Sequence, residues 1–393
     1  MTIAKLGFGM MRLPLLEKGV GMARPARSGM MRETFARPIP IDFAQLNKMV
    51  DLFLAKGFKY FDTSYVYHLG ASEDAVKQAL TSRHKREEYL LATKLPTFII
   101  TSYEQAETIF QEQLANCGVE YFDYYLLHNV YSQTYKENIE PNKLFDLAKE
   151  KKAAGKIKKL GFSFHDTPEL LDKVLTEHPE TDFVQISVNY LDWESLFIQS
   201  RKCYEVIRKH GKEVVIMGPV KGGTLSHVPD AAEKKMRAMH PDWSPATWAL
   251  KFANSLDGVI AVLSGMTYMD EVEENVVMLQ DGSPLNADEF ALLEEVAREL
   301  SLSGVFHEAD YSKYPAFLEN GMPVAALLQG YNHLVIQGDP TFGIELNYYK
   351  NFRYNAGIPA GESWIEGKVC DKEGNDITEK LKVAEQFFLE NSF

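Results

Sequence analysis

Residues 59–73 read KYFDTSYVYHLGASE, and this stretch opens with a short apolar run that ends at an acidic side chain, Asp62. Similar runs, rich in β-branched and aromatic residues, recur between longer helical patterns, which is typical of strand–helix units around a parallel sheet. The runs are residues 5–11, 59–64, 89–94, 121–128, 158–164, 183–189, 213–220 and 258–265. Several are apolar almost throughout, as strands buried on both faces should be. Their number predicts an α/β fold, a (β/α)8 TIM barrel.

Helical patterns separate the predicted strands. Residues 42–56 place apolar side chains on one face behind a capping aspartate, Asp42, and Ser244 with Pro245 begins a helix before the last strand. An open doubly wound sheet is the alternative arrangement of such units. That fold favours a GxGxxG turn after a strand, and the sequence has no such turn. The barrel is therefore the favoured fold.

The strand–helix rhythm stops near residue 285. Residues 287–301 look helical, and the tail after them is rich in Gly, Pro, Tyr and Asn and ends with a helical pattern over 376–390. We predict a barrel over residues 1–285 and a mainly helical and irregular C-terminal extension over 286–393. A second irregular stretch, residues 14–40, follows the first strand and carries four arginines. In a barrel this stretch either covers the active site or forms a mobile surface loop.

Composition excludes several classes of function. The formal net charge of −13 argues against a protein that neutralises nucleic-acid phosphates. Three widely spaced cysteines, Cys117, Cys203 and Cys370, form neither a disulfide framework nor a metal-cluster motif, and they suit a reducing cytoplasm. The sequence shows no signal-peptide pattern and no apolar stretch of about 18 residues or more. We expect a cytoplasmic protein with a small-molecule substrate and neither nucleic acid nor membrane as partner; a homo-oligomer stays open.

Polar side chains lie at or just after the ends of three consecutive predicted strands. Asp62 and Tyr67 follow the second strand, Lys94 ends the third and His128 ends the fourth. Barrel enzymes keep catalytic groups at the C-terminal ends of their strands. A buried carboxylate can hold an ammonium group, which can lower the pKa of a phenol from about 10 until the phenol donates a proton near neutral pH. These four residues predict acid–base chemistry.

Three short motifs carry a family resemblance. FDTSYVYHLGASE (61–73), ATKLP (92–96) and DYYLLH (123–128) resemble, in this order, the signatures of the aldo-keto reductase family. The resemblance implies an NAD(P)H-dependent oxidoreductase that reduces an aldehyde or ketone to an alcohol, or runs the reverse reaction. Tyr67 would then be the general acid, Lys94 and Asp62 would tune it, and His128 would orient the substrate or assist proton transfer. The hydride would come from the nicotinamide.

The same resemblance assigns cofactor positions along the later strands. LGFSFH (160–165) is similar to the family's GxSxH-type strand, and Gln185 matches the amide that holds the nicotinamide carboxamide. MGPVKGG (217–223) resembles the loop around the pyrophosphate, and VLSGMTYMDEVEENV (262–276) resembles the last cofactor strand and helix, whose N–H groups suit an anion. The predicted cofactor residues are Gly9, Met10, Ser163, His165, Gln185, Met217, Gly218, Pro219, Val220, Lys221, Gly222, Ser264, Gly265, Met266, Glu274 and Asn275.

The charges near the last strand bear on the choice of nucleotide. Residues 264–280 contain no basic side chain and carry Asp270, Glu271, Glu273 and Glu274. Family members that prefer NADP carry Lys or Arg beside the ribose 2′-phosphate, whereas here that phosphate would meet like charge. The sequence therefore leans modestly toward NAD(H) over NADP(H), unless Lys221 or the arginines of residues 14–40 reach the phosphate.

The overall pattern carries a second, more specific resemblance, which bears on the extension. MRLP (11–14), YHLGASE (67–73) and VKGG (220–223) are similar to a bacterial branch of the family whose C-terminal part is ferredoxin-like and rich in cysteine. Only Cys370 remains there in this chain, and a four-iron cluster needs a full set of thiolates. We predict a degenerate ferredoxin-like scaffold without an iron–sulfur cluster. His307, Glu308 and Asp310 are the alternative metal-binding group, but we expect them to be solvated and predict no metal.

Other classes of function stay open at this point. A cofactor-binding redox-sensing or regulatory module without physiological turnover would keep the barrel, although the intact set of Asp62, Tyr67, Lys94 and His128 counts against it. A metal-dependent isomerase or aldolase barrel needs more carboxylates and histidines at its strand ends. A Schiff-base role for Lys94 conflicts with Asp62, which would keep the amine charged. Candidates to line the substrate pocket or to pack in the scaffold are Tyr65, His68, Tyr131, Tyr190 and Trp193.

Overall fold

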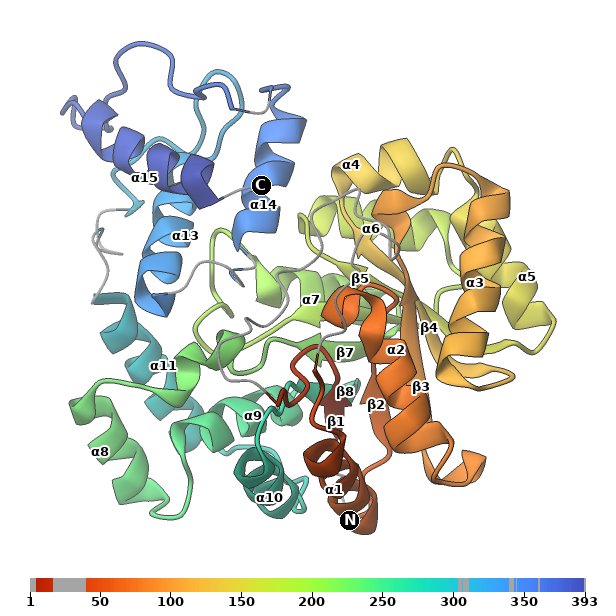
Figure 1. The fold of residues 1–393 in the computed structure, drawn as a ribbon. Coiled ribbons are helices and arrows are strands. Elements are labelled where there is room, and N and C mark those ends of the chain that lie inside the picture. The colour runs from red at the N-terminus through yellow and green to blue at the C-terminus, as the bar shows by residue number, and fades with distance from the viewer. Residues whose placement is uncertain are drawn as a thin grey trace.

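The computed structural model describes residues 5–16, 40–302, 306, 311–338, 343, 345–359 and 361–391. Within these residues, eight parallel strands close into a barrel in chain order (Figure 1). The strands are β1 (Leu6–Gly9), β2 (Tyr60–Asp62), β3 (Leu90–Leu95), β4 (Phe122–Val130), β5 (Ile157–Phe164), β6 (Phe183–Ser187), β7 (Glu213–Met217) and β8 (Val259–Ser264). Each predicted run overlaps one of these strands, and β3, β4 and β5 extend one or two residues beyond their runs, so the predicted (β/α)8 barrel is confirmed.

Helices surround the barrel. They are α1 (Phe43–Ala55), α2 (Ala71–Val76), α3 (Tyr103–Cys117), α4 (Ser132–Thr134), α5 (Leu144–Ala153), α6 (Pro168–Glu177), α7 (Ser200–Lys209), α8 (Asp230–Met239), α9 (Pro245–Ser255) and α10 (Met269–Met278). Both predicted caps are present: Asp42 Oδ1 accepts from Gln45 N at 3.0 Å, and Ser244 Oγ accepts from Thr247 N at 3.1 Å. These side chains satisfy amides that the first turn of a helix leaves without a partner.

The barrel interior is tightly packed. A layer of buried side chains fills it, among them Tyr60, Phe183 and Leu263. Gly161 on β5 lies against this layer, because a Cβ there would come within 2.6 Å of both the ring and the carbonyl oxygen of Phe183. The backbone of Gly161 does not need a left-handed conformation, so the requirement for glycine at this position is purely steric.

We therefore expect Gly161→Ala to destabilise the barrel. Overpacking of this kind typically costs about 1–3 kcal/mol, because neighbouring atoms must shift. The urea midpoint of unfolding, followed by circular dichroism, should fall by a corresponding amount. A midpoint equal to that of the wild type would contradict this prediction, because it would mean that β5 and β6 can move apart to accommodate the added Cβ without loss of stability.

Beyond the barrel strands, the chain forms α11 (Ala287–Leu302), α13 (Val324–Gln337), α14 (Glu345–Asn355) and α15 (Thr378–Asn391). Helix α11 contributes Leu293 and Val296 to the barrel's apolar core. The later helices share a separate core around Trp364 and Phe388, which Phe197 from the loop after β6 joins. Figure 1 shows α13, α14 and α15 (blue) together beside the barrel. The extension is thus mainly helical, as predicted, and it packs on barrel loops.

Several predictions fall outside the part of the chain that the structure describes. These are the arginine-bearing residues 17–39 and the group His307, Glu308 and Asp310. Among the residues that are described, no helix is both long and apolar enough to cross a bilayer.

Candidate active site

A buried ion pair lies at the ends of β2 and β3. Lys94 Nζ donates to Asp62 Oδ1 at 2.5 Å and to the carbonyl oxygen of Thr63 at 2.8 Å, and Lys94 is fully buried. Burial alone would lower the pKa of Lys94, but the Asp62 carboxylate more than compensates and raises it. The ammonium therefore stays charged, which argues against Schiff-base chemistry at this lysine.

Tyr67 lies next to this ion pair. The Lys94 ammonium is 4.7 Å from the centre of the Tyr67 ring, and Tyr67 itself is partly exposed. The residues after it, His68 and Leu69, have φ angles of 50° and 55°, in the left-handed region that bulky side chains avoid. His68 stabilises this turn, because its Nε2 accepts from Leu13 N at 2.9 Å. The turn after β2 is thereby tied to the loop after β1.

The pKa of Tyr67 differs from the prediction. Burial raises it above its ordinary value of 10, and the Lys94 ammonium lowers it by less than burial raises it. The physical reason is that desolvation of the phenolate is the largest effect on the pKa, and the Asp62 carboxylate opposes the Lys94 ammonium, so the ammonium offsets only part of the desolvation cost. The phenol is therefore protonated at neutral pH, the form that a proton donor needs.

His128, on β4, completes the group. Its ring meets the Tyr67 ring edge-on, with 5.9 Å between the ring centres, and its Nδ1 lies 3.1 Å from Ser64 Oγ. Burial, together with the Lys94 ammonium and His165, holds the pKa of His128 well below its usual value. The imidazole is therefore neutral. The structure thus brings the four predicted catalytic residues together at the C-terminal end of the barrel, with Asp62, Lys94 and His128 around Tyr67.

The predicted nicotinamide residues line the adjacent strands β5 and β6. Ser163 Oγ accepts from Asn129 N at 2.9 Å, and burial lowers the pKa of His165 to about 4. Gln185 Nε2 lies 3.5 Å from Met217 Sδ, while Gln185 Oε1 and His165 Nδ1 are buried with no hydrogen-bond partner among the described residues. Buried polar atoms are nearly always paired, so these two atoms mark a place where a polar ligand fits.

The loops after β7 and β8 lie beside each other. The first contains Gly218 and Gly222 with positive φ angles of 61° and 66° and the short helix η7 (Lys221–Ser226). In TIM barrels the loops after strands 7 and 8 frequently bind phosphate. Arg12, in the loop after β1, bridges them: its Nη1 donates to the Gly222 carbonyl oxygen at 3.2 Å, and its Cδ would lie 3.1 Å from a Cβ on Gly265.

Arg12 was missed as a site residue at the sequence level. The MRLP motif was used only for its similarity to a bacterial branch of the family. A single arginine after a strand does not by itself indicate a binding site. Gly9 contributes to the same region, since a Cβ there would lie 3.2 Å from the Ser264 carbonyl oxygen. Met10, by contrast, is fully buried, and its carbonyl oxygen accepts from Ser72 Oγ at 3.0 Å.

Several other predicted cofactor residues have partners within the protein. Met266 is buried in the apolar core, Glu274 Oε1 accepts from Thr247 Oγ1 at 2.9 Å, and Asn275 Nδ2 donates to Ser264 Oγ at 3.2 Å. Met217 contacts Gln185, and Pro219 and Val220 lead from it to Lys221. Lys221 itself is buried in an ion cluster.

The start of α10 corrects one prediction. We expected its amides to be available to an anion, but Glu271 Oε2 accepts from Thr267 N at 2.6 Å and from Tyr268 N at 3.0 Å. Asp270 likewise accepts from Glu271 N at 3.0 Å. A glutamate at the third position of a helix is a known cap signal, and it was present in the sequence. Carboxylates of the helix therefore accept from three of the amides that an anion would otherwise use, those of Thr267, Tyr268 and Glu271.

The predicted pocket-lining residues divide into two groups. The Tyr65 hydroxyl donates to Glu112 on α3 at 2.7 Å, and the Trp193 ring packs against Tyr204 and Phe252, so both have contacts in the scaffold. His68 is buried and holds the first loop. Partly exposed Tyr131 and buried Tyr190 follow β4 and β6 at the catalytic end of the barrel.

Comparisons with known proteins agree with this geometry. A model of the aldo/keto reductase family matches residues 28–298. The uncharacterized oxidoreductase YqkF of Bacillus subtilis is 23% identical over 260 residues, which are 58% of this chain and 80% of that protein.

Solved structures share the fold. The holo form of aldo-keto reductase AKR11C1 from Bacillus halodurans has a TM-score of 0.56 and 22% identity, over 76% of this chain and 93% of that one. An aldo-keto reductase from Klebsiella pneumoniae in complex with NADPH has a TM-score of 0.55 and 18% identity, over 75% and 94% of the two chains. Since the family model spans more than half of the sequence, the chain belongs to the aldo/keto reductase family and is an NAD(P)-dependent oxidoreductase that acts on carbonyl or alcohol groups.

Proposed function

We propose that the protein reduces an aldehyde or ketone to an alcohol, or runs the reverse reaction, with Tyr67 as the general acid and base. The observation that carries this proposal is the position of the Lys94 ammonium, which lies between the Asp62 carboxylate, at 2.5 Å, and the Tyr67 ring, at 4.7 Å. A fixed positive charge beside a protonated phenol stabilises the phenolate that proton donation leaves behind.

Each residue then has a distinct part in the reaction. When bound, the reduced nicotinamide supplies a hydride to the carbonyl carbon. Tyr67 donates its proton to the carbonyl oxygen, Lys94 stabilises the resulting phenolate, and Asp62 keeps Lys94 in place. His128 is neutral, so it orients the carbonyl through a hydrogen bond without adding a charge. In alcohol oxidation the Tyr67 phenolate accepts the proton instead.

We propose two groups of residues for the nicotinamide nucleotide. Ser163, His165 and Gln185 hold the nicotinamide end, because Gln185 Oε1 is a buried acceptor with no partner among the described residues and suits the carboxamide N–H. The loops after β7 and β8 hold the phosphates, with Arg12 as the nearby cation. The other predicted cofactor residues stay predictions. Partners within the protein weaken the assignment to cofactor binding of four of them: Lys221, Met266, Glu274 and Asn275.

The test is a titration of the protein with NADH and NADPH, followed through tryptophan fluorescence. A panel of aldehydes and ketones is then screened through the loss of nicotinamide absorbance. We expect saturable binding and turnover of at least one carbonyl. Binding of neither nucleotide would contradict the proposal, and binding without any turnover across the panel would favour a redox-sensing module.

We further propose NAD(H) as the preferred nucleotide, because Glu271 covers the amides at the start of α10. Glu271→Gln should improve NADPH binding relative to NADH by about fivefold, since one charge near a helix N-terminus is worth up to about 1 kcal/mol. The ratio of the two dissociation constants measures this. Glu273→Gln, a neighbouring exposed carboxylate, is the control and should leave the ratio near that of the wild type; an unchanged ratio in Glu271→Gln would contradict the assignment.

The division of the chain into a barrel over 1–285 and an extension over 286–393 also stays a proposal, although α11 packs in the barrel core. We propose that the extension is degenerate ferredoxin-like and binds no iron–sulfur cluster, since Cys370 is the one cysteine in residues 286–393. The cytoplasm is the compartment that we propose for the protein.

A further inference from the structure

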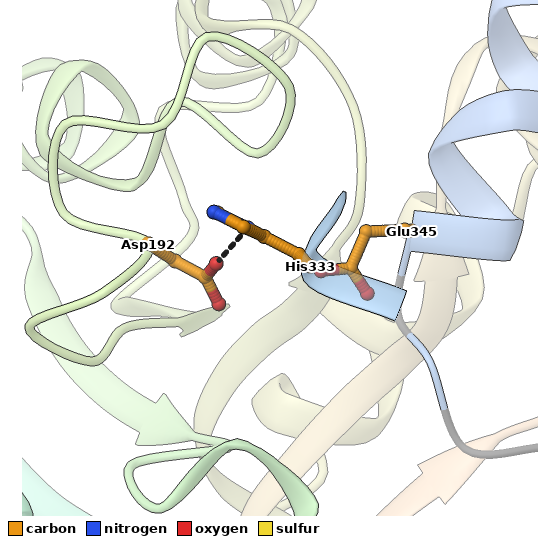
Figure 2. A group of neighbouring side chains, drawn as sticks. All are labelled: Asp192, His333 and Glu345. Carbon is orange, nitrogen blue, oxygen red and sulfur yellow. Dashed lines mark ion pairs between the residues drawn. The ribbon is translucent and has the colours of Figure 1, made fainter. Parts of the chain in front are cut away.

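A buried ionic cluster joins the C-terminal extension to the loop after β7. Lys221 Nζ donates to Asp192 Oδ1 and Oδ2, at 2.7 and 2.8 Å, and to Glu345 Oε1 at 2.6 Å. His333 Nδ1 lies 3.1 Å from Asp192 Oδ1. Figure 2 shows Asp192, His333 and Glu345 as neighbours, with the ion pair between Asp192 and His333 as a dashed line. Asp192 and Lys221 belong to barrel loops, whereas His333 on α13 and Glu345 on α14 belong to the extension.

The cluster has the spacing of a metal site but already contains a cation. One ligand atom from each of Asp192, His333 and Glu345 lies within 4.8 Å of the other two. The Lys221 ammonium, however, hydrogen bonds both carboxylates, and it is buried with them. The ammonium thus occupies the place between the two carboxylates that a metal ion would take. Glu345 Oε2 and His333 Nδ1 have no hydrogen-bond partner among the described residues, while the Lys221 contacts join barrel loops to the extension.

Lys221 is also strained in its backbone. Its φ angle is 47°, a left-handed conformation that a residue with a long side chain adopts only when its surroundings hold it there. Gly218, Gly222 and Gly223 near it also have positive φ angles. Because glycine adopts positive φ angles as readily as negative ones, these neighbours do not by themselves hold Lys221 in its conformation. Backbone hydrogen bonds from Lys221 N to the Gly218 carbonyl oxygen, at 3.0 Å, and from Gly223 N to the Val220 carbonyl oxygen, at 3.1 Å, hold the turn locally. The contacts of the Lys221 side chain with Asp192 and Glu345 anchor this turn to the rest of the protein.

The loop that is fixed in this way borders the proposed phosphate site. Gly222, next to Lys221, accepts from Arg12 Nη1 through its carbonyl oxygen. The extension reaches the same place a second time, since Gln337 Nε2, at the end of α13, would lie 3.7 Å from a Cβ on Gly222. The extension thus contacts the loop at two places: Glu345 hydrogen bonds the buried Lys221, and Gln337 lies beside Gly222.

We propose that Glu345 and His333 of the extension are positioning residues for nucleotide binding. Glu345 hydrogen bonds Lys221 directly, His333 lies beside Asp192, and together they keep the loop after β7 in its binding form. This inference rests on the proposed function, because it requires that the loop binds the nucleotide. It gives the extension a role in an enzyme whose catalytic residues all lie on or just after β2, β3 and β4.

The first test is Glu345→Gln, which keeps the shape of the side chain and removes its charge. If the loop then holds its binding form about one tenth of the time, the dissociation constant of the preferred nucleotide rises about tenfold. Stopped-flow measurement should show this change in nucleotide association and dissociation rates. We expect kcat at saturating nucleotide to stay near the wild-type value, since Tyr67, Lys94 and His128 are untouched.

A second variant protects the test against misfolding. Lys221→Met alone would leave the Asp192 and Glu345 carboxylates as two buried negative charges without the ammonium that pairs with both. Lys221→Met together with Glu345→Gln leaves one carboxylate, Asp192, beside His333. This double variant should fold, as far-ultraviolet circular dichroism would show, and should bind nucleotide as weakly as Glu345→Gln does. The matched control is Lys235→Met, which removes exposed ion pairs between α8 and the α11 residues Glu295 and Glu299. It should leave nucleotide binding unchanged.

The outcomes separate this inference from the proposed function. A wild-type protein that binds neither nucleotide would overturn both. A wild-type protein that binds one, with folded Glu345→Gln and double variants that have wild-type association and dissociation rates, would overturn the positioning role alone. A fall in kcat with no change in nucleotide binding would also overturn it, because the extension would then act on the reacting groups.

Discussion

Replacing Tyr67 by phenylalanine is expected to lower carbonyl turnover by about 10²–10⁴-fold, the usual contribution of a general acid, while nucleotide affinity stays close to wild type. The change removes only the hydroxyl. The ring keeps its place between the Lys94 ammonium, 4.7 Å from its centre, and the His128 ring, 5.9 Å away. Steady-state kcat at saturating nucleotide, together with the dissociation constant from tryptophan fluorescence, measures the two effects separately.

Tyr65→Phe is the matched control, two residues earlier in the same loop. It also removes a phenolic hydroxyl, but one that donates to Glu112 on α3 at 2.7 Å. Turnover in this control should remain within about threefold of wild type, since exposed hydrogen bonds contribute little. If Tyr67→Phe instead kept a tenth or more of the wild-type turnover, another group would have to donate the proton.

The pH profile of the wild-type protein gives a linked expectation. Burial raises the pKa of Tyr67 above 10, so the protonated acid persists to higher pH than in a free phenol. Reduction needs this protonated form, and therefore its rate should stay level through the neutral range and fall only in alkaline solution above about pH 10. His128, whose pKa lies well below its usual value, adds no step near neutrality. A fall centred near pH 7 would contradict this assignment.

The barrel, and the grouping of the proposed catalytic residues, could be predicted from local patterns. Strand-length apolar runs fixed the number of strands, and Asp62, Lys94 and His128 stood at strand ends, which a parallel barrel brings to one face. Caps such as Asp42 and Ser244 were equally local, because a cap and its amide lie within three residues of each other. Features of this kind need no knowledge of which distant segments meet.

The rest depends on contacts between distant segments. Lys221 was predicted as a cofactor residue because MGPVKGG resembles the family's pyrophosphate loop. Only the packing of α13 and α14 shows that its charge is held by Glu345 and Asp192. Arg12 lacked any pattern until the loops after β7 and β8 met around it. The net pKa of Tyr67 was also unpredictable from sequence, since it depends on how far burial outweighs a partly neutralised ammonium.

Lys94→Met is expected to affect both stability and turnover. The variant leaves the Asp62 carboxylate buried without its partner, and breaking a buried ion pair in this way typically costs about 3–5 kcal/mol of the free energy of unfolding. Turnover should fall about 10²–10³-fold, because the phenolate of Tyr67 loses the charge that stabilises it. Urea unfolding measures the first effect, and kcat at a temperature where the variant is folded measures the second.

The double variant Asp62→Asn with Lys94→Met distinguishes the two roles of this lysine. Removing both charges leaves no unpaired ion, so most of the lost stability should return. Turnover should not return, because the field that favours the Tyr67 phenolate is still missing. If activity recovered together with stability, Lys94 would serve only to balance Asp62, and Tyr67 would have to donate its proton without help from the ammonium. A stable but inactive double variant would instead show that the ion pair exists to place one positive charge beside the Tyr67 phenol.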